Sequence, residues 1–418
     1  MKKIYLIILL TLISENLMCL ENWRFYNPSN SGLSSTDIKV LEIDNNDNIW
    51  IGTKTKGIYF FNKYNWVNYD TKNHKDLIDI RAICFDKDEK TWTGTSVGLL
   101  SKDGDSWQKY KDFNPKILWD YPVMSAYVDK NNIKWFGTEN GLAKIDGDSL
   151  FFYDMNNSEI PQYYITAIHQ DKNNVLWLGT EYNGLIRFDG NEWKNYDMKN
   201  SPIPHTFVKD IASDSNNVLW IATGNGLANF DGLNWQVFNK TNSQIPDNEI
   251  ESIEFFGNTF WGAGSWYGLV KFEDNIWTSY NKNNSELPTN NLKKLAIDKL
   301  GNIWIATRDS GVCVFNENGI VAVEDDNITE SSNINILAYP NPATDRTTIH
   351  YYLDNNEYIH LDLYDSSGGL VKSLESGYKS AGFGTLDIFT AGLSSGTYFV
   401  KMKSAKGEET SLKIIIYK

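Results

Sequence analysis

Short runs of alternating apolar and polar residues, separated by turns rich in Asp, Asn and Gly, follow one another along most of the chain. One unit contains an apolar run at 165–168, an Asp- and Asn-rich turn at 171–174, a run around Trp177, a run that begins at Gly184 and a final run at 193–196. Runs of this length between such turns are typical of β-strands. The pattern therefore predicts units of four short strands.

The Trp of this unit occurs seven times at an almost constant spacing of 41 to 43 residues. Four strands within such a period form one blade of a β-propeller. Seven repeats predict an all-β fold with a seven-bladed β-propeller, in which the repeated Trp, Gly and Asp residues serve folding. The seven Trp residues are Trp50, Trp92, Trp135, Trp177, Trp220, Trp261 and Trp304.

The two ends of the repeat region complement each other. The seventh unit ends at Phe315 and lacks the final Trp-x-x-Tyr strand, whereas such a strand occurs near the N-terminus at Trp23–Tyr26. We expect this N-terminal strand to complete the last blade, because an unpaired sheet edge invites aggregation. The predicted propeller spans residues 22–318.

The repeat pattern ends before the C-terminus. Residues 319–335 are rich in Asn, Asp, Glu and Ser, which is typical of a linker. Residues 336–418 then contain six or seven short strand-like runs. Strands of this number and length predict a small immunoglobulin-like β-sandwich.

Both regions resemble known families. The pattern Asn-Ile-Trp-Ile-Gly-Thr at 48–53, with the following Gly-Leu, Phe-Asp-Gly and Trp positions of the repeat, resembles the two-component regulator propeller repeat. That resemblance implies an extracytoplasmic sensor of the kind found in hybrid histidine kinases. No kinase or membrane-spanning pattern accompanies the repeats in this sequence, so we expect a binding or scaffolding module.

The C-terminal region resembles the type IX secretion sorting domain. The matching segments are Tyr-Pro-Asn-Pro at 339–342, the residues at 361–368 and 393–401, and the tail at 413–418. This resemblance implies transport across the outer membrane of a Gram-negative bacterium by the type IX machinery. The domain is then usually removed, and the remainder is released or attached to the cell surface.

The N-terminus agrees with export. Lys2 and Lys3 precede an apolar run at 4–13 that is too short to span a bilayer, which predicts a signal peptide at 1–19. Lipidation at Cys19 is an open alternative. No later run is long and apolar enough for a transmembrane helix.

The net charge and the absence of catalytic and metal-binding motifs exclude several classes of function. The net charge of −14 argues against a nucleic-acid partner. Cys84 and Cys313 lie in apolar runs and are expected to be buried free thiols. The five His residues have no zinc-ligand spacing, and no nucleophile elbow or phosphate loop occurs, so we expect no catalytic residue, metal or cofactor.

Strand order places two sets of loops on one face of the propeller: those that enter the inner strands and those between the second and third strands. Aromatic residues and one His in these loops are candidates for stacking on sugars or for contact with a partner protein. They are Trp119, Tyr121, Tyr163, Tyr164, Tyr182, His205, Trp266 and Tyr267.

A second candidate site is the mouth of the central channel. One position of the repeat lies five residues before the turn Asp, and the shorter sixth unit has an aligned position. Four of the seven residues at this position are basic. Positive charge at the mouth would attract an anionic ligand such as an acidic saccharide. These positions hold Lys39, Arg81, Met124, Thr166, Lys209, Glu251 and Lys293.

These features favour a secreted or surface binding module for a carbohydrate or protein ligand. Two alternatives stay open. A polysaccharide lyase or glycoside hydrolase would need carboxylates from different blades to converge, which the sequence does not reveal. A structural adhesin component would bind no small ligand.

Overall fold

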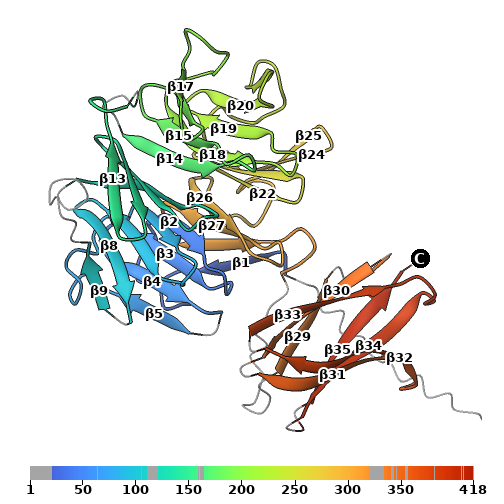
Figure 1. Ribbon diagram of the computed structural model, residues 1–418. Helices are drawn as coiled ribbons and strands as arrows, with labels where there is room; N and C mark the ends of the chain where they lie inside the picture. The colour runs from blue at the N-terminus through green and yellow to red at the C-terminus, as the bar shows by residue number, and fades with distance from the viewer. Residues whose placement is uncertain are drawn as a thin grey trace, which may run out of the picture.

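A computed structural model describes residues 21–418 except 64, 105, 111–120, 159, 161–163, 321–333, 340–342, 345, 354–355, 381, 406, 408 and 418. These residues form 35 β-strands and no α-helix, in nine sheets. Seven four-stranded sheets surround a central axis as a propeller, and the C-terminal strands form a separate sandwich (Figure 1). The all-β fold with seven blades and a sandwich is confirmed.

Six blades consist of four consecutive strands, numbered outward from the channel. Blade 1 contains β2 (Ile38–Ile43), β3 (Ile49–Thr53), β4 (Ile58–Phe61) and β5 (Trp66–Tyr69). Blade 2 contains β6 (Ala82–Phe85), β7 (Thr91–Thr95), β8 (Gly98–Asp103) and β9 (Ser106–Lys109). Blade 3 contains β10 (Val123–Val128), β11 (Lys134–Thr138), β12 (Leu142–Asp146) and β13 (Ser149–Tyr153). Blade 4 contains β14 (Ile165–Gln170), β15 (Leu176–Thr180), β16 (Leu185–Phe188) and β17 (Trp193–Tyr196). Blade 5 contains β18 (Val208–Ser213), β19 (Leu219–Thr223), β20 (Gly226–Phe230) and β21 (Trp235–Phe238). Blade 6 contains β22 (Ile250–Phe256), β23 (Thr259–Gly264), β24 (Gly268–Glu273) and β25 (Ile276–Tyr280).

Blade 7 joins the two ends of the propeller. It contains β26 (Leu292–Ile297), β27 (Ile303–Thr307) and β28 (Val312–Phe315), and its outer strand is β1 (Trp23–Tyr26). Trp23 pairs with Phe315 in antiparallel register, and their rings lie 4.2 Å apart. The N-terminal strand therefore completes the last blade, as its sequence predicted.

The repeated Trp and Gly residues pack neighbouring blades together. Trp177 of blade 4 is almost fully buried, and its ring lies 6.0 Å from that of Phe230 in blade 5. A Cβ atom at Gly179 would lie only 2.6 Å from the side chain of Val208, so a larger residue would push blade 5 away. The assignment of these residues to folding agrees with the structure.

The repeated Asp organises the turn before the Trp strand in six of the seven blades, whereas the shorter turn of blade 6 contains Gly257 and Asn258. In blade 4, Asp171 Oδ1 accepts hydrogen bonds from the backbone N–H groups of Asn173 and Val175, at 2.8 and 3.0 Å. Its Oδ2 accepts one from Trp177 Nε1 at 3.0 Å. The corresponding bonds to the Trp occur at Asp44, Asp86, Asp129 and Asp298. The Asp therefore fixes both the turn and the indole, which is a structural role.

Blade 5 is an exception to this arrangement. Asp214 makes the two backbone bonds, at 2.9 Å each, but Trp220 Nε1 has no hydrogen-bond partner among the residues that the structure describes.

The C-terminal sandwich contains β29 (Ile334–Tyr339), β30 (Arg346–Leu353), β31 (Glu357–Asp365), β32 (Leu370–Lys379), β33 (Gly382–Phe389), β34 (Gly396–Ser404) and β35 (Glu409–Ile416). The sheet orders are β29-β30-β33 and β32-β31-β34-β35. Ile349, Leu361, Val400 and Ile414 contribute to its own buried core. The predicted signal peptide at 1–19 and most of the linker at 319–335 lie outside the described residues, and the domain boundaries stay a prediction.

The exception in blade 5 provides a test of the Asp turn. Asp171→Ala should lower the free energy of unfolding by about 1 kcal/mol more than Asp214→Ala, because only Asp171 also satisfies an indole N–H. Denaturant unfolding of the two variants measures this difference. Equal losses would show that the hydrogen bond to Trp177 adds nothing to stability.

Candidate functional site

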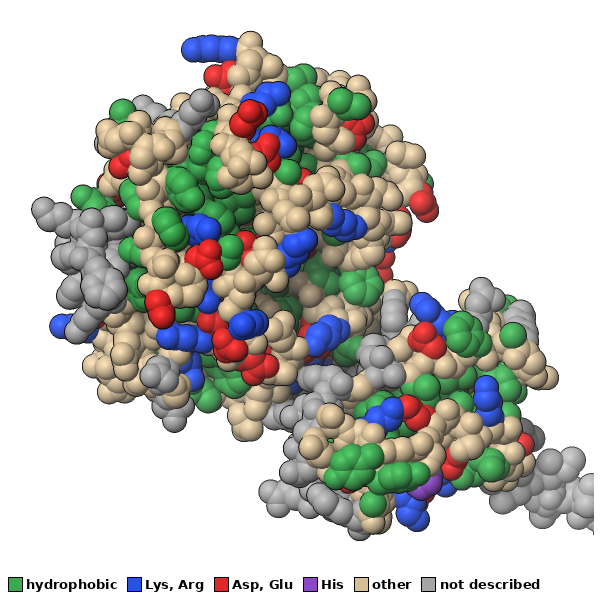
Figure 2. All heavy atoms as spheres, in the orientation of Figure 1, with side chains coloured by type: hydrophobic (Ala, Val, Ile, Leu, Met, Phe, Trp, Pro, Cys, Tyr) green, Lys and Arg blue, Asp and Glu red, His purple; other side chains and the backbone are tan. Residues whose placement is uncertain are grey.

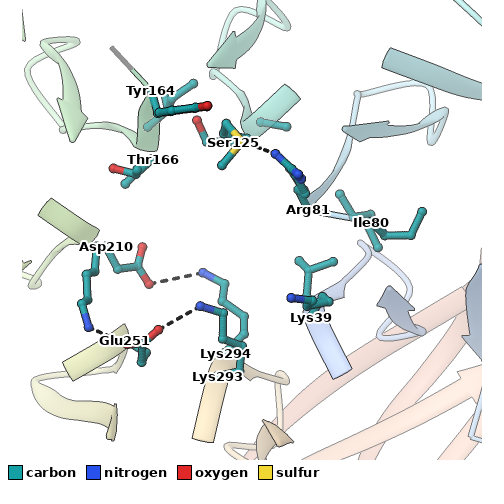
Figure 3. Close-up of a pocket in the computed structure, with 18 of the residues that line it drawn as sticks. Lys39, Ile80, Arg81, Ser125, Tyr164, Thr166, Asp210, Glu251, Lys293 and Lys294 are labelled. Atoms are coloured by element: carbon teal, nitrogen blue, oxygen red, sulfur yellow. Dashed lines mark hydrogen bonds and ion pairs between the residues drawn. The ribbon is translucent and has the colours of Figure 1, made fainter. Parts of the chain in front are cut away.

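A cavity of about 600 Å³ lies at one end of the central channel. This cavity is lined by one residue from each blade, and these are the seven residues predicted from the sequence to lie at the channel mouth. Figure 2 shows Lys, Arg, Asp and Glu side chains gathered around the hollow in the propeller, and Figure 3 shows the cavity from close range. We call these seven residues the mouth ring: Lys39, Arg81, Met124, Thr166, Lys209, Glu251 and Lys293.

A β-bulge explains why this position faces the channel. In blade 1, Ile38 pairs with Thr53 while Val40 pairs with Gly52, so Lys39 is an extra residue in the inner strand. The same register shift occurs in blades 3 to 7. A bulge of this kind turns a side chain away from the regular alternation. The fixed place of the bulge in the repeat is what brings the mouth ring together.

Carboxylates compensate most of the positive charge at the mouth. Glu251 accepts hydrogen bonds from Lys209 Nζ at 2.5 Å and Lys293 Nζ at 2.8 Å, and Arg308 Nη2 lies 3.3 Å away. Burial opposes ionisation of Glu251, but Lys293 and Lys209 outweigh it and lower the pKa of this carboxyl to about 2. Glu251 is therefore a permanent anion among three cations.

Arg81 is also paired, whereas Lys39 is not. Arg81 Nε and Nη2 donate to Asp79 Oδ2 at 3.1 and 2.8 Å. Lys39 has no hydrogen bond or ion pair with a residue that the structure describes. The expected excess of positive charge is thus much smaller than the sequence suggested, and it is concentrated on Lys39.

A second charged cluster, which sequence reasoning missed, lines the channel wall. Lys294 Nζ lies 3.3 Å from Asp210 Oδ2 and 4.0 Å from Glu42 Oε1, and it also interacts with Glu254. These four residues come from the inner strands of blades 7, 5, 1 and 6. Their signal in the sequence was an acidic residue or a Lys where the inner strands of other blades carry Val, Ala, Ser, Cys, Tyr or His.

Burial changes the proton affinity of this cluster. It raises the pKa of Glu42 to about 7 and that of Glu254 to about 8, with Lys294 acting in the opposite direction. Burial also opposes the charge of Lys294, but Asp210, Glu42 and Glu254 outweigh it, so its pKa is raised. Below about pH 7, the channel wall therefore favours protons on both carboxyl groups beside a charged ammonium.

The candidate loop aromatics have different environments. The rings of Tyr121, Tyr182, Trp266 and Tyr267 are exposed, with Trp266 at 65% and Tyr182 at 56%. Trp266 Nε1 donates to Glu249 Oε2 at 2.9 Å, and the Tyr182 hydroxyl donates to Glu181 Oε1 at 2.9 Å. Glu181 lines the cavity, and Glu249 Oε1 lies 3.9 Å from Lys209 Nζ. These two aromatics therefore border the mouth.

The remaining candidates divide into three groups. Tyr164 lines the cavity itself. His205 is turned inward: its Nδ1 accepts a hydrogen bond from the backbone N–H of Phe207 at 2.9 Å, and its ring packs over Gly224, which is a structural role. Trp119 and Tyr163 lie outside the described residues.

The described residues also bear on metal binding, thiol chemistry and membrane insertion. They contain no group of three His, Cys, Asp or Glu side chains arranged to hold a metal ion. Cys84 and Cys313 are buried free thiols, and burial raises the pKa of both. In the part of the chain that is described, no helix has the length and apolarity to cross a membrane.

Family models match segments of the propeller and nearly all of the C-terminal sandwich. The family model for the two-component regulator propeller matches residues 32–55, 159–182 and 202–225. The model for the secretion system C-terminal sorting domain matches residues 337–417. The chain carries two-component regulator propeller repeats and a type IX secretion sorting domain. This sorting domain indicates export to the outer membrane or cell surface and implies interaction with the secretion machinery.

Solved structures share the propeller fold of this chain. The search of curated proteins found no match. One of the solved structures is the extracellular domain of a hybrid two-component system, BT3049, from B. thetaiotaomicron, with 19% identity, a TM-score of 0.63 and coverage of 95% of this chain and 57% of that one. Another is PorZ, a surface component of the type IX secretion system of Porphyromonas gingivalis, with 16% identity, a TM-score of 0.58 and coverage of 94% and 61%. The chain thus spans about three fifths of the length of these two proteins.

A third structure matches a smaller part of this chain. Virginiamycin B lyase from Staphylococcus aureus has 16% identity and a TM-score of 0.57, over 70% of this chain and 98% of that one. Identities this low show a shared fold and carry no information about ligands.

The raised pKa values predict a pH dependence of stability. Unfolding returns Glu42 and Glu254 to ordinary carboxyl pKa values, so the folded protein binds more protons between about pH 4.5 and 8. The free energy of unfolding contributed by these groups must therefore fall as pH rises through this interval. We expect the variant Glu42→Gln/Glu254→Gln to weaken that fall by about 1 kcal/mol, less than the full shifts imply because Glu42 is partly exposed.

Denaturant unfolding at intervals between pH 5 and 8 measures this effect. The exposed carboxylate variant Glu192→Gln is the control and should follow the wild-type curve. A double variant with the wild-type pH dependence would refute the assignment of these protons to the channel wall.

Proposed function

We propose that the protein is an exported binding module whose ligand occupies the mouth of the propeller channel. The observation that carries this proposal is the mouth ring, in which one side chain from every blade faces a single cavity of about 600 Å³. The ring positions vary between Lys, Arg, Glu, Thr and Met, whereas the Trp and Asp positions that hold the fold nearly repeat. Variable residues on a rigid scaffold are the usual place of a binding site.

The surroundings of the mouth favour a polar ligand with flat apolar faces, such as a carbohydrate. Trp266 and Tyr182 are exposed aromatic surfaces at its border, and both are held in place by hydrogen bonds to carboxylates. Aromatic rings stack on the apolar faces of sugars, and the ion pairs around Glu251 offer donors and acceptors for hydroxyl groups. A protein loop that enters the mouth is the alternative ligand.

The place of action follows from the sorting domain. We propose that a signal peptide at 1–19 starts export and that residues 336–418 direct passage through the type IX machinery. The propeller would then act outside the cell or attached to its surface. The surface role of PorZ and the extracellular place of the BT3049 domain agree with this proposal.

A second candidate function is a lyase or glycoside hydrolase. It is favoured by Glu42 and Glu254, because carboxyl groups with pKa values of about 7 and 8 are suited to general acid–base chemistry. Release of new reducing ends or unsaturated products from a bound polysaccharide would support it, provided that Glu254→Gln abolishes the release. Binding without turnover would favour the binding module. A structural adhesin component would show neither.

Filling the mouth tests the leading proposal. Met124→Trp adds a bulky ring to the cavity wall and should weaken binding of any glycan selected on an array by at least about tenfold, because the ligand and the indole would compete for one space. Glu192→Trp adds the same ring on an exposed turn of blade 4 and should leave affinity unchanged. Calorimetric titration measures both, and unfolding curves confirm that both variants are folded. Wild-type affinity in a folded Met124→Trp variant would place the ligand elsewhere.

A further inference from the structure

The charges at the mouth nearly cancel, and the remainder lies on one side chain. Apart from the paired channel-wall cluster around Lys294, four carboxylates, those of Asp79, Glu181, Glu249 and Glu251, border the mouth among the described residues, against five cations. Four of these cations, Arg81, Lys209, Lys293 and Arg308, are already in ion pairs with Asp79 or Glu251. The fifth is Lys39, which has no such partner.

The place of Lys39 makes it a strong point of attraction for an anion. Its neighbours in the mouth ring are Lys293 of blade 7 and Arg81 of blade 2, so an anion at Lys39 also lies near these two charges (Figure 3). Because these side chains line a cavity, their interactions are screened less than those on an open surface.

The opposite wall carries no cation, has Glu181 as its carboxylate, and offers a second polar group without a partner among the described residues. Tyr164 lines the cavity from the loop before β14, and Figure 3 shows its side chain across the opening from Lys39. The Tyr164 hydroxyl makes no hydrogen bond with a described residue. Thr166 and Ser125 beside it already donate to the backbone carbonyls of Val208 and Ile165. Among the described residues, Lys39 and Tyr164 therefore present an unpartnered ammonium on one wall and an unpartnered phenol on the other.

We propose that this pair forms a subsite for a uronate residue of an acidic saccharide, with its carboxylate at Lys39 and a ring hydroxyl at Tyr164. The inference rests on the proposed binding role of the mouth. A single unpaired cation among four carboxylates accepts one carboxylate per ligand unit. A polysulfated glycan or an acidic peptide, with charges close together, would be repelled by Glu181, Glu249 and Glu251. Trp266 and Tyr182 then lie where neighbouring sugar rings of the chain would stack.

The test uses the purified full-length protein and a panel of oligosaccharides of galacturonate, glucuronate and mannuronate. Each is paired with its methyl ester, which keeps the sugar and removes the charge. A sulfated oligosaccharide and an oligoglutamate peptide complete the panel. We expect at least one uronate oligosaccharide to bind, and its methyl ester to bind about tenfold or more weakly.

Two variants assign the charge dependence to the mouth. Lys39→Gln should lower affinity for the uronate to that of the ester while leaving binding of the ester unchanged. Lys56→Gln removes an exposed Lys from a loop of the same blade and should behave as wild type. Tyr164→Phe should weaken both ligands by a similar, smaller factor, because it removes a hydrogen bond and keeps the ring.

The possible failures separate the subsite from the proposed function. Wild-type affinity in Lys39→Gln, together with loss of binding in Met124→Trp, would overturn the uronate subsite and leave the mouth as the binding site. Binding unaffected by Met124→Trp would overturn both. Preference for the sulfated oligosaccharide or the peptide, or no binding of any uronate, would overturn the assigned ligand class.

Discussion

The antiparallel pairing of β1 with β28 is the interaction on which the rest of the propeller depends. It connects residues almost 300 positions apart in the chain and gives blade 7 its outer strand. Each blade buries both faces only when it has a neighbour on either side, so an open array would expose the apolar faces of blades 1 and 7 to water. Closure also creates the channel, because seven inner strands surround a space that their side chains do not fill at the mouth.

Within this closed ring, folding and binding use different positions of the same repeat. Trp, Gly and Asp hold the blades together and recur with little change, as the bonds from Asp171 illustrate. The bulged residue contributes little to that packing and faces the cavity, so its identity differs from blade to blade. The result is a rigid frame with a set of independently variable side chains at one end of the channel, which is an arrangement suited to recognition.

The sequence predicted those parts of the molecule that depend on the period alone. Blade number, ring closure and the convergence of Lys39 with the other mouth-ring residues all follow from a constant offset within the repeat. It did not predict that Glu251 neutralises Lys209 and Lys293, or that Lys294 contacts Asp210 two blades away, because such pairs depend on side-chain reach across the channel. Nor did loop position distinguish exposed Trp266 from His205, which a single backbone hydrogen bond holds inward.

A crystal structure of the protein with a bound uronate oligosaccharide would show whether the propeller binds its ligand at the channel mouth. We expect electron density for a sugar ring inside the mouth ring, with its carboxylate within hydrogen-bonding distance of Lys39 Nζ and a hydroxyl near Tyr164. Density for the saccharide on the sides of the blades or on the sandwich, with the mouth empty, would contradict this expectation.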